Sequence, residues 1–271
     1  DCLAQIVHRR NLLFMAAMAG TPTRIKNVPK CDDIDTTIDC LREMGCTFSI
    51  NSLGDEIVVN PFPKTSPLPN VYLNFRDSAT TAKMAITLCS ALGMKAHCKG
   101  SSVLIKRKMI SLTSRLALRG AMLSNFSLPC DVTGRMTAGE FEFPGNEGTQ
   151  AINAVMMFAS CLLNDSTIKF STPIVDDTFN RMTANSMKDF GVMIEETADG
   201  YHVIGRQYYQ SPGEVYVEAD WGLATMWTMA GAACARKGTG ISVDYLNANS
   251  IQKYRNTAPI NTLVYQDFTE M

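Results

Sequence analysis

Small hydroxyl and amide side chains stand at the beginning of two apolar, helix-like segments of this chain. They are Ser78, Thr80 and Thr81 at the start of segment 80–92, and Thr149 and Gln150 at the start of segment 149–163. The first turn of a helix has backbone N–H groups without intrahelical partners, and the helix dipole adds partial positive charge there. Such a terminus suits a phosphate or carboxylate group. The same hydroxyl groups also serve as ordinary N-caps, and the sequence leaves both interpretations open.

Two short runs of basic residues flank elements of the same kind. Lys106-Arg107-Lys108 follows the strand-like stretch 102–105, and His8-Arg9-Arg10 precedes the apolar segment 11–19. Facing an anion-binding cleft, Arg107 or Arg10 would clamp a phosphate or carboxylate through charge-assisted hydrogen bonds. The alternative interpretation is a solvated surface, the commoner role of a short cationic run.

Other classes of site and location find little support in the sequence. There is no Ser/His/Asp set, no P-loop and no G-x-G-x-x-G. The net charge of -1 does not favour nucleic-acid binding. No apolar run reaches the ~18 residues that a membrane span needs, and residues 11–20 lack a signal-peptide cleavage pattern.

The cysteines predict unbonded thiols. There are nine, an odd number, and no C-x-x-C pair exists. This usage indicates a reducing compartment, either the cytoplasm or an organelle interior. A zinc site is not expected, because none of the three histidines lies near paired cysteines.

Four apolar, helix-like segments recur along the chain at a nearly constant interval. They cover residues 11–19, 80–92, 149–163 and 223–236. Each ends at a residue suited to a helix C-terminus, and successive ends lie 73, 71 and 74 residues apart: Gly20, Gly93, Asn164 and Gly238. The interval predicts a repeated unit of about 70 residues, complete three times and partial a fourth time.

Each complete unit contains a second helix-like segment that ends in a glycine and leads into a strand. The glycines are Gly45, Gly120 and Gly191, which follow the first helix ends by 25, 27 and 27 residues. Gly54-Asp55 and Asp199-Gly200 are hairpin signals between the last two strands of their units. Each unit therefore reads β-α-β-α-β-β.

The predicted fold is α/β: a pseudo-threefold domain of three βαβαββ units, residues 1–217, with buried helices and outer sheets. The first helix of each unit is almost wholly apolar and should be buried, whereas the second carries charges such as Asp35 and Glu43 and should be exposed. Residues 218–271 form only the start of a fourth unit. Its apolar helix, 223–236, then needs a cover from a second domain or a protein partner.

These units, in this order, resemble the enolpyruvyl transferase family. The resemblance rests on residues 12–45, 106–121, 148–160, 187–195, 217–243 and 250–252, and covers nearly the whole chain. It implies two domains of three such units closing over a cleft, with this chain matching the first part. The implied reaction moves the enolpyruvyl group of phosphoenolpyruvate onto the 5-hydroxyl of shikimate 3-phosphate and releases phosphate. The resemblance implies no metal and no organic cofactor.

The resemblance also assigns substrate contacts to particular residues. Arg107 matches an arginine that binds phosphoenolpyruvate. Gln150 matches the last residue of a Ser-Ser-Gln motif, in which Thr149 keeps a hydroxyl group and Gly148 does not. Two carboxylates match an acidic pair that precedes the fourth helix: Glu218 and Asp220.

Several positions depart from the family pattern. Ile6-Val7 replaces a lysine-serine pair, Asn11 replaces an arginine, and Arg9 or Arg10 substitutes only if the register shifts. The motif Gly-Asn-Ala-Gly-Thr reads Asp77-Ser78-Ala79-Thr80-Thr81, and Asp176 takes the place of a serine. Two acidic side chains therefore stand where the family binds anions.

Two hypotheses from different classes follow. The first is a divergent enzyme, seen as a fragment or as half of a split pair. The family's catalytic aspartate and glutamate belong to the part that this chain does not match, so we expect no turnover by this chain alone. The second is a non-catalytic homologue, kept as a binding module or as a structural subunit of a larger assembly.

Overall fold

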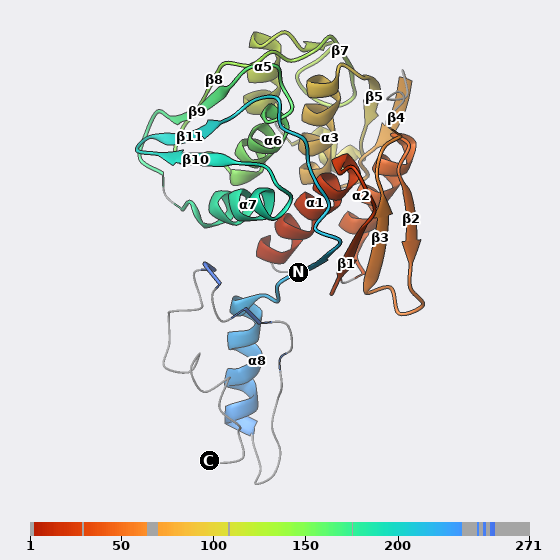
Figure 1. Cartoon of the computed structure of the whole chain (residues 1–271), viewed down its shortest axis with the longest axis vertical. Coiled ribbons are helices and arrows are strands. Elements are labelled where there is room, and N and C mark those ends of the chain that lie inside the picture. The colour runs from red at the N-terminus through yellow and green to blue at the C-terminus, as the bar shows by residue number, and fades with distance from the viewer. Residues whose placement is uncertain are drawn as a thin grey trace.

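Three apolar helices form the centre of the fold, with sheets arranged around them (Figure 1). The computed structural model describes residues 3–28, 30–63, 70–107, 109–174, 176–234, 243, 246–247 and 250–252. The central helices are α1 (Leu3–Met18), α3 (Ala79–Leu92) and α6 (Thr149–Ala159). Their described side chains are mostly buried, as predicted. The rings of Phe14 and Phe158 meet edge to face, with centroids 5.9 Å apart.

The ends of the central helices agree only partly with the glycine pattern. α3 ends at Gly93, which has a φ of +74° as a left-handed C-cap requires. α6 ends at Ala159 and not near Asn164, so that prediction was wrong. The reason is tertiary: the backbone carbonyls of Ser160 and Leu162 accept hydrogen bonds from a passing segment, residues 206–207. These carbonyls therefore have hydrogen-bond partners without another turn of α6.

The second helices are α2 (Asp32–Glu43), α5 (Ile110–Leu118) and α7 (Thr178–Asp189). Each buries one face and leaves the other more exposed, which refines the expectation of exposed helices that rested on charges along one face. In α2, Ile34 and Ile38 are buried while Arg42 and Glu43 are exposed, because its apolar positions recur at helical spacing. Each helix is followed by its predicted glycine with positive φ: Gly45, Gly120 and Gly191.

The stretch 102–105, predicted as a strand, is a short helix, α4 (Ser102–Ile105). The Ser101 hydroxyl accepts hydrogen bonds from the backbone N–H groups of Val103 and Leu104, at 3.2 and 3.1 Å. This N-cap starts a helical turn where the apolar residue types alone favour a strand.

Two of the three sheets are built by the second and third units in the same strand order. The second unit forms β4-β5-β7-β6, from β4 (Asn70–Asn74), β5 (Lys95–Lys99), β6 (Met122–Leu123) and β7 (Cys130–Thr133). The third forms β8-β9-β11-β10, from β8 (Glu140–Phe143), β9 (Ser166–Phe170), β10 (Ile194–Thr197) and β11 (Gly200–Val203). In each sheet the first two strands are parallel and the rest antiparallel. The predicted repeat is confirmed.

The remaining sheet combines the two ends of the three-unit region. The first unit supplies β1 (Thr23–Lys26), β2 (Thr47–Ile50) and β3 (Glu56–Asn60). The strand that the repeat places before α1 is instead β12 (Glu214–Tyr216), which follows the third unit. β12 pairs parallel to β1, with Val215 opposite Ile25, and gives the order β12-β1-β3-β2. The strand that follows the third unit thus completes the sheet of the first unit.

The first helix of the predicted fourth unit, α8 (Trp221–Cys234), extends away from the three sheets (Figure 1). Trp221 and Ala224 are buried, whereas Met226, Trp227 and Met229 are 67%, 62% and 51% exposed. The strand expected at 240–245 lies mostly outside the described residues. In the described part of the chain no helix combines the length and the apolar character needed to cross a membrane.

Candidate anion-binding site

A cavity of about 570 Å³ lies beside the N-terminus of α3. Four of the six predicted site residues line it: Arg10, Thr80, Arg107 and Gln150. They belong to α1, α3, the segment after α4, and α6, so packing of the three units brings them together. The cavity therefore joins two arginines, a hydroxyl and an amide, which are ordinary ligands of phosphate and carboxylate groups.

Arg10 lies inside a helix and not before one. α1 begins at Leu3, so the run His8-Arg9-Arg10 is helical, and Arg9 and Arg10 are buried. An Nη group of Arg10 donates to Asp33 Oδ1 at 3.4 Å and to Ser78 Oγ at 3.2 Å. Burial lowers the pKa of Arg10 while Asp33 raises it, and an arginine keeps its charge in proteins. The solvated-surface interpretation of this run is thus wrong.

The hydroxyl groups at the start of α3 have divided roles. Ser78 is the N-cap and accepts a hydrogen bond from the Thr81 backbone N–H at 3.4 Å. Thr81 is fully buried, and its hydroxyl lies 2.8 Å from those of Ser78 and Thr37. Thr80 lines the cavity, whereas Thr81 and Thr149 do not.

Lys83 is a cation near the site that the sequence analysis missed. Its Nζ donates to Gln150 Oε1 at 3.1 Å, which links α3 to α6. Burial lowers the pKa of Lys83, Glu147 opposes this shift and Arg107 adds to it. Lys83 is the only charged residue in α3, and that isolation within an apolar helix was the available signal.

Carboxylates also line the cavity, as the departures from the family pattern indicated. Asp33 is paired with Arg10. Asp77 accepts a hydrogen bond from the Ser101 hydroxyl, which disperses part of its negative charge. Arg76 lines the cavity too, but its guanidinium is bound to Asp39 at 2.5 Å. Among the described residues, no ion pair or side-chain hydrogen bond occupies Arg107.

The other acidic positions are held by their own local contacts. Asp176 Oδ1 accepts from the Thr178 backbone N–H at 3.0 Å, at the start of α7. Asp220 Oδ1 caps α8 by accepting from the Leu223 N–H at 2.8 Å. Glu218 Oε1 accepts from Gln252 Nε2 at 2.9 Å. Asp176 and Asp220 therefore organise helix starts, whereas Glu218 holds the Gln252 side chain.

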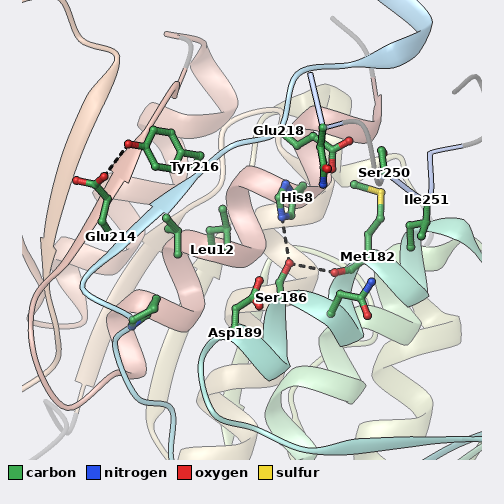
Figure 2. Close-up of a pocket in the computed structure, with 14 residues that line it drawn as sticks. His8, Leu12, Met182, Ser186, Asp189, Glu214, Tyr216, Glu218, Ser250 and Ile251 are labelled. Atoms are coloured by element: carbon green, nitrogen blue, oxygen red, sulfur yellow. Dashed lines mark hydrogen bonds between the residues drawn. The ribbon is translucent and has the colours of Figure 1, made fainter. Parts of the chain in front are cut away.

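A second cavity, of about 480 Å³, lies between α1, α7 and the chain that leads into α8 (Figure 2). Three carboxylates line it, from Asp189, Glu214 and Glu218, and burial raises the pKa of both Asp189 and Glu218. The basic side chain in its lining is that of His8. This charge balance opposes an anion, so the cavity with Arg107 is the better anion site.

His8 lies directly against Ser186 in the lining of this second cavity (Figure 2). Their Nε2 and Oγ atoms are 3.0 Å apart, and the Ser186 hydroxyl donates to the Met182 carbonyl, so His8 Nε2 carries the proton. The buried Nδ1 has no hydrogen-bond partner among the described residues. Burial, with Arg9 beside it, lowers the pKa of His8 to about 4.

Acid should destabilise the fold through His8. Between about pH 6.5 and 4 His8 binds a proton in the unfolded chain but not in the folded chain. The free energy of unfolding therefore decreases as the pH falls through this range, and the full contribution of neutral His8 is present above pH 6.5. At pH 4.5 we expect the free energy of unfolding to be lower by about 1–2 kcal/mol. This is less than the whole pKa difference would give, because the His8 ring is partly exposed. Urea unfolding of wild type and His8→Gln across this range measures it. Parallel pH profiles for the two proteins would contradict it.

The fold is that of the enolpyruvyl transferases. The EPSP synthase of Acinetobacter baumannii superposes with a TM-score of 0.71 at 17% identity, covering 84% of this chain and 50% of that one. The enolpyruvyl transferase NikO from Streptomyces tendae superposes with a TM-score of 0.60 at 17% identity, over 83% and 53% of the two chains. At such identities the likeness establishes the fold.

The sequence establishes the family. The family model for EPSP synthase (3-phosphoshikimate 1-carboxyvinyltransferase) matches residues 4–261, so this chain belongs to the EPSP synthase family. The 3-phosphoshikimate 1-carboxyvinyltransferase of Idiomarina loihiensis is 28% identical over 257 residues, which are 92% of this chain and 59% of that protein. That of Saccharolobus solfataricus is 25% identical over 235 residues, 87% and 53% of the two. The chain thus spans between half and three fifths of the length of these relatives.

Proposed function

We propose that this chain supplies the substrate-clamping domain of a 3-phosphoshikimate 1-carboxyvinyltransferase. Residues 1–217 would form the domain and residues 218–271 the start of the next one. The observation that carries the proposal is the single cavity that gathers Arg10, Thr80, Arg107 and Gln150 from four separate elements. Family membership supports the choice of substrates, phosphoenolpyruvate and shikimate 3-phosphate.

Arg107 is the side chain best suited to meet an incoming anion. It lines the cavity, is exposed, and its guanidinium can donate to two oxygens of one phosphate or carboxylate. Arg10 and Ser78 form the buried wall behind it, at the N-terminus of α3, where the helix dipole adds positive potential. Lys83 holds Gln150 toward the same cavity.

The proposed reaction breaks one bond and forms another. The bond from the enol carbon of phosphoenolpyruvate to its phosphate oxygen breaks, and inorganic phosphate leaves. The 5-oxygen of shikimate 3-phosphate bonds to that carbon and loses its proton, which the released phosphate carries in the overall balance. The residues of this cavity would bind and orient the two anions, which raises their effective concentration toward each other. Proton transfer needs carboxylates, which the resemblance places outside this chain.

A second domain or separate partner is proposed to cover α8. The helix is apolar throughout, yet Met226, Trp227 and Met229 stand largely in solvent. An apolar surface of this kind is typical of an interface. Its cover would also bring the remaining catalytic groups to the cavity.

A non-catalytic binding module is the second candidate. The acidic lining favours it, because Asp32, Asp33 and Asp77 offset the charge of the arginines in the same cavity. On this interpretation the chain binds anions weakly or not at all, and it serves as a structural subunit of a larger assembly.

Binding and turnover separate the two candidates. Calorimetry with phosphoenolpyruvate and shikimate 3-phosphate should show saturable binding by this chain. Phosphate release should appear only when a second polypeptide carrying the rest of the family sequence is added. Absence of binding would rule out the cavity as the substrate site. Weak or absent binding together with no phosphate release, whatever the complement, would favour the non-catalytic module.

Restoring a family serine at the start of α6 should strengthen the site. Gly148 is the N-cap of α6, makes no side-chain cap, and has open space where a Cβ atom would lie. Gly148→Ser should stabilise the fold by a few tenths of a kcal/mol and tighten phosphoenolpyruvate binding about 2–10-fold, because it adds one donor at the helix N-terminus. Gly20→Ser, also in open space, is the control. Equal effects of both changes would contradict the prediction.

A further inference from the structure

Two buried cysteines face each other across the sheet of the second unit. Cys98 of β5 and Cys130 of β7 are partners in antiparallel register, and they are 3% and 4% exposed. Directly opposed residues in antiparallel strands have Cα atoms about 4.5–5.5 Å apart and side chains on the same face. Disulfides span about 4.4–6.8 Å between Cα atoms. The register of the two strands therefore gives Cys98 and Cys130 a Cα–Cα separation that suits a disulfide.

The two thiols also interact with each other. A hydrogen bond between them raises the pKa of Cys98 and lowers that of Cys130. Their interaction therefore favours a thiol on one sulfur and a thiolate on the other. Thiolates are the attacking species in thiol–disulfide exchange.

A cavity of about 340 Å³ lies over the outer face of these strands, where exposed His97 and Lys99 alternate with the inward-facing Cys98. Both cysteines contribute to its lining, but their thiols belong to the core on the opposite face, so a reagent reaches them when this strand pair opens. Other buried thiols lack this arrangement. Cys40 and Cys89 lie on helices, and burial raises the pKa of Cys40 to about 12 and that of Cys89 as well.

We propose that Cys98 and Cys130 form a redox-sensitive dithiol that closes to a disulfide by exchange with an oxidised small thiol such as glutathione disulfide. The Cys130 thiolate attacks one sulfur of the reagent and releases one glutathione. Cys98 loses its proton and attacks the Cys130 sulfur of the mixed disulfide, which releases the second glutathione. Two protein thiols are oxidised, and one glutathione disulfide is reduced to two glutathione molecules.

The disulfide should be visible as a defined cross-link. The full chain is incubated with glutathione disulfide, alkylated and digested with trypsin under non-reducing conditions. The expected product joins fragment 96–99 to fragment 120–135, which contain Cys98 and Cys130, and dithiothreitol should abolish it. Because β5 and β7 are then tied together, Tm should rise by about 5 °C or more.

Variants provide the matched controls. Cys130→Ala should lose both the cross-link and the rise in Tm, whereas Cys89→Ala, a buried thiol outside the pair, should keep both. Peptide mapping of the wild-type chain does not depend on any variant folding. The proposal is overturned if exposed Cys234 becomes fully oxidised while no 98–130 link forms. It is also overturned if the rise in Tm persists in Cys130→Ala.

Discussion

Phosphoenolpyruvate should bind the Arg107→Ala chain about 10–100-fold more weakly than the wild-type chain. Arg107 lines the anion cavity, and no other described residue occupies its guanidinium. A hydrogen bond to a charged group contributes about 1.5–3 kcal/mol, which corresponds to this loss. Because Arg107 is exposed, its removal should leave Tm within about 1 °C of wild type.

Lys106→Ala is the matched control for this prediction. Lys106 is the exposed neighbour of Arg107, carries the same charge, and is outside the cavity lining. Calorimetry at low and at physiological ionic strength should show a large loss only for Arg107→Ala. Equal losses for the two variants, both vanishing with salt, would mean that only the general field of the protein attracts the ligand.

Removing the Phe158 ring should cost the fold about 3–5 kcal/mol. Phe158 of α6 is fully buried and meets Phe14 of α1 edge to face, with ring planes at 73°. Phe158→Ala loses the transfer free energy of the ring, leaves a cavity between two central helices, and removes an aromatic pair worth about 0.5–1.5 kcal/mol. For a chain of this size Tm should fall by about 10 °C.

Urea unfolding checks the size and origin of this loss. Phe126→Ala, at a residue 41% exposed, should cost less than about 1 kcal/mol and serves as the control. Phe158→Leu should fall between the two, because leucine fills part of the space. If Phe158→Ala is no worse than Phe126→Ala, the central helices do not share the core that the structure describes.

Much of the fold could be predicted because its signals are local. A wholly apolar helix and a glycine with positive φ can each be recognised from a few residues, and their regular spacing located Gly45, Gly120 and Gly191. Where a contact from elsewhere replaced a local signal, the prediction failed. α6 ends early because residues 206–207 bind the carbonyls of Ser160 and Leu162 just beyond it.

The site could be predicted only in part. Arg107 and Gln150 were found through the family resemblance, and the fold places both in one cavity with Arg10 and Thr80. Lys83 was missed because its role depends on α3 lying against α6. Thr81 was included as one of the hydroxyl residues at the start of this helix, but packing against Thr37 buries its hydroxyl.

The sequence by itself determined the repeat, the helices that the repeat requires and the family to which they belong. It could do so because helix periodicity and turn chemistry depend on neighbouring residues. Only the tertiary structure decided that β12 completes the first sheet, that Arg10 is buried against Asp33, and that Cys98 faces Cys130. Each of these is a pairing between distant segments, set by packing and register, which no local pattern encodes.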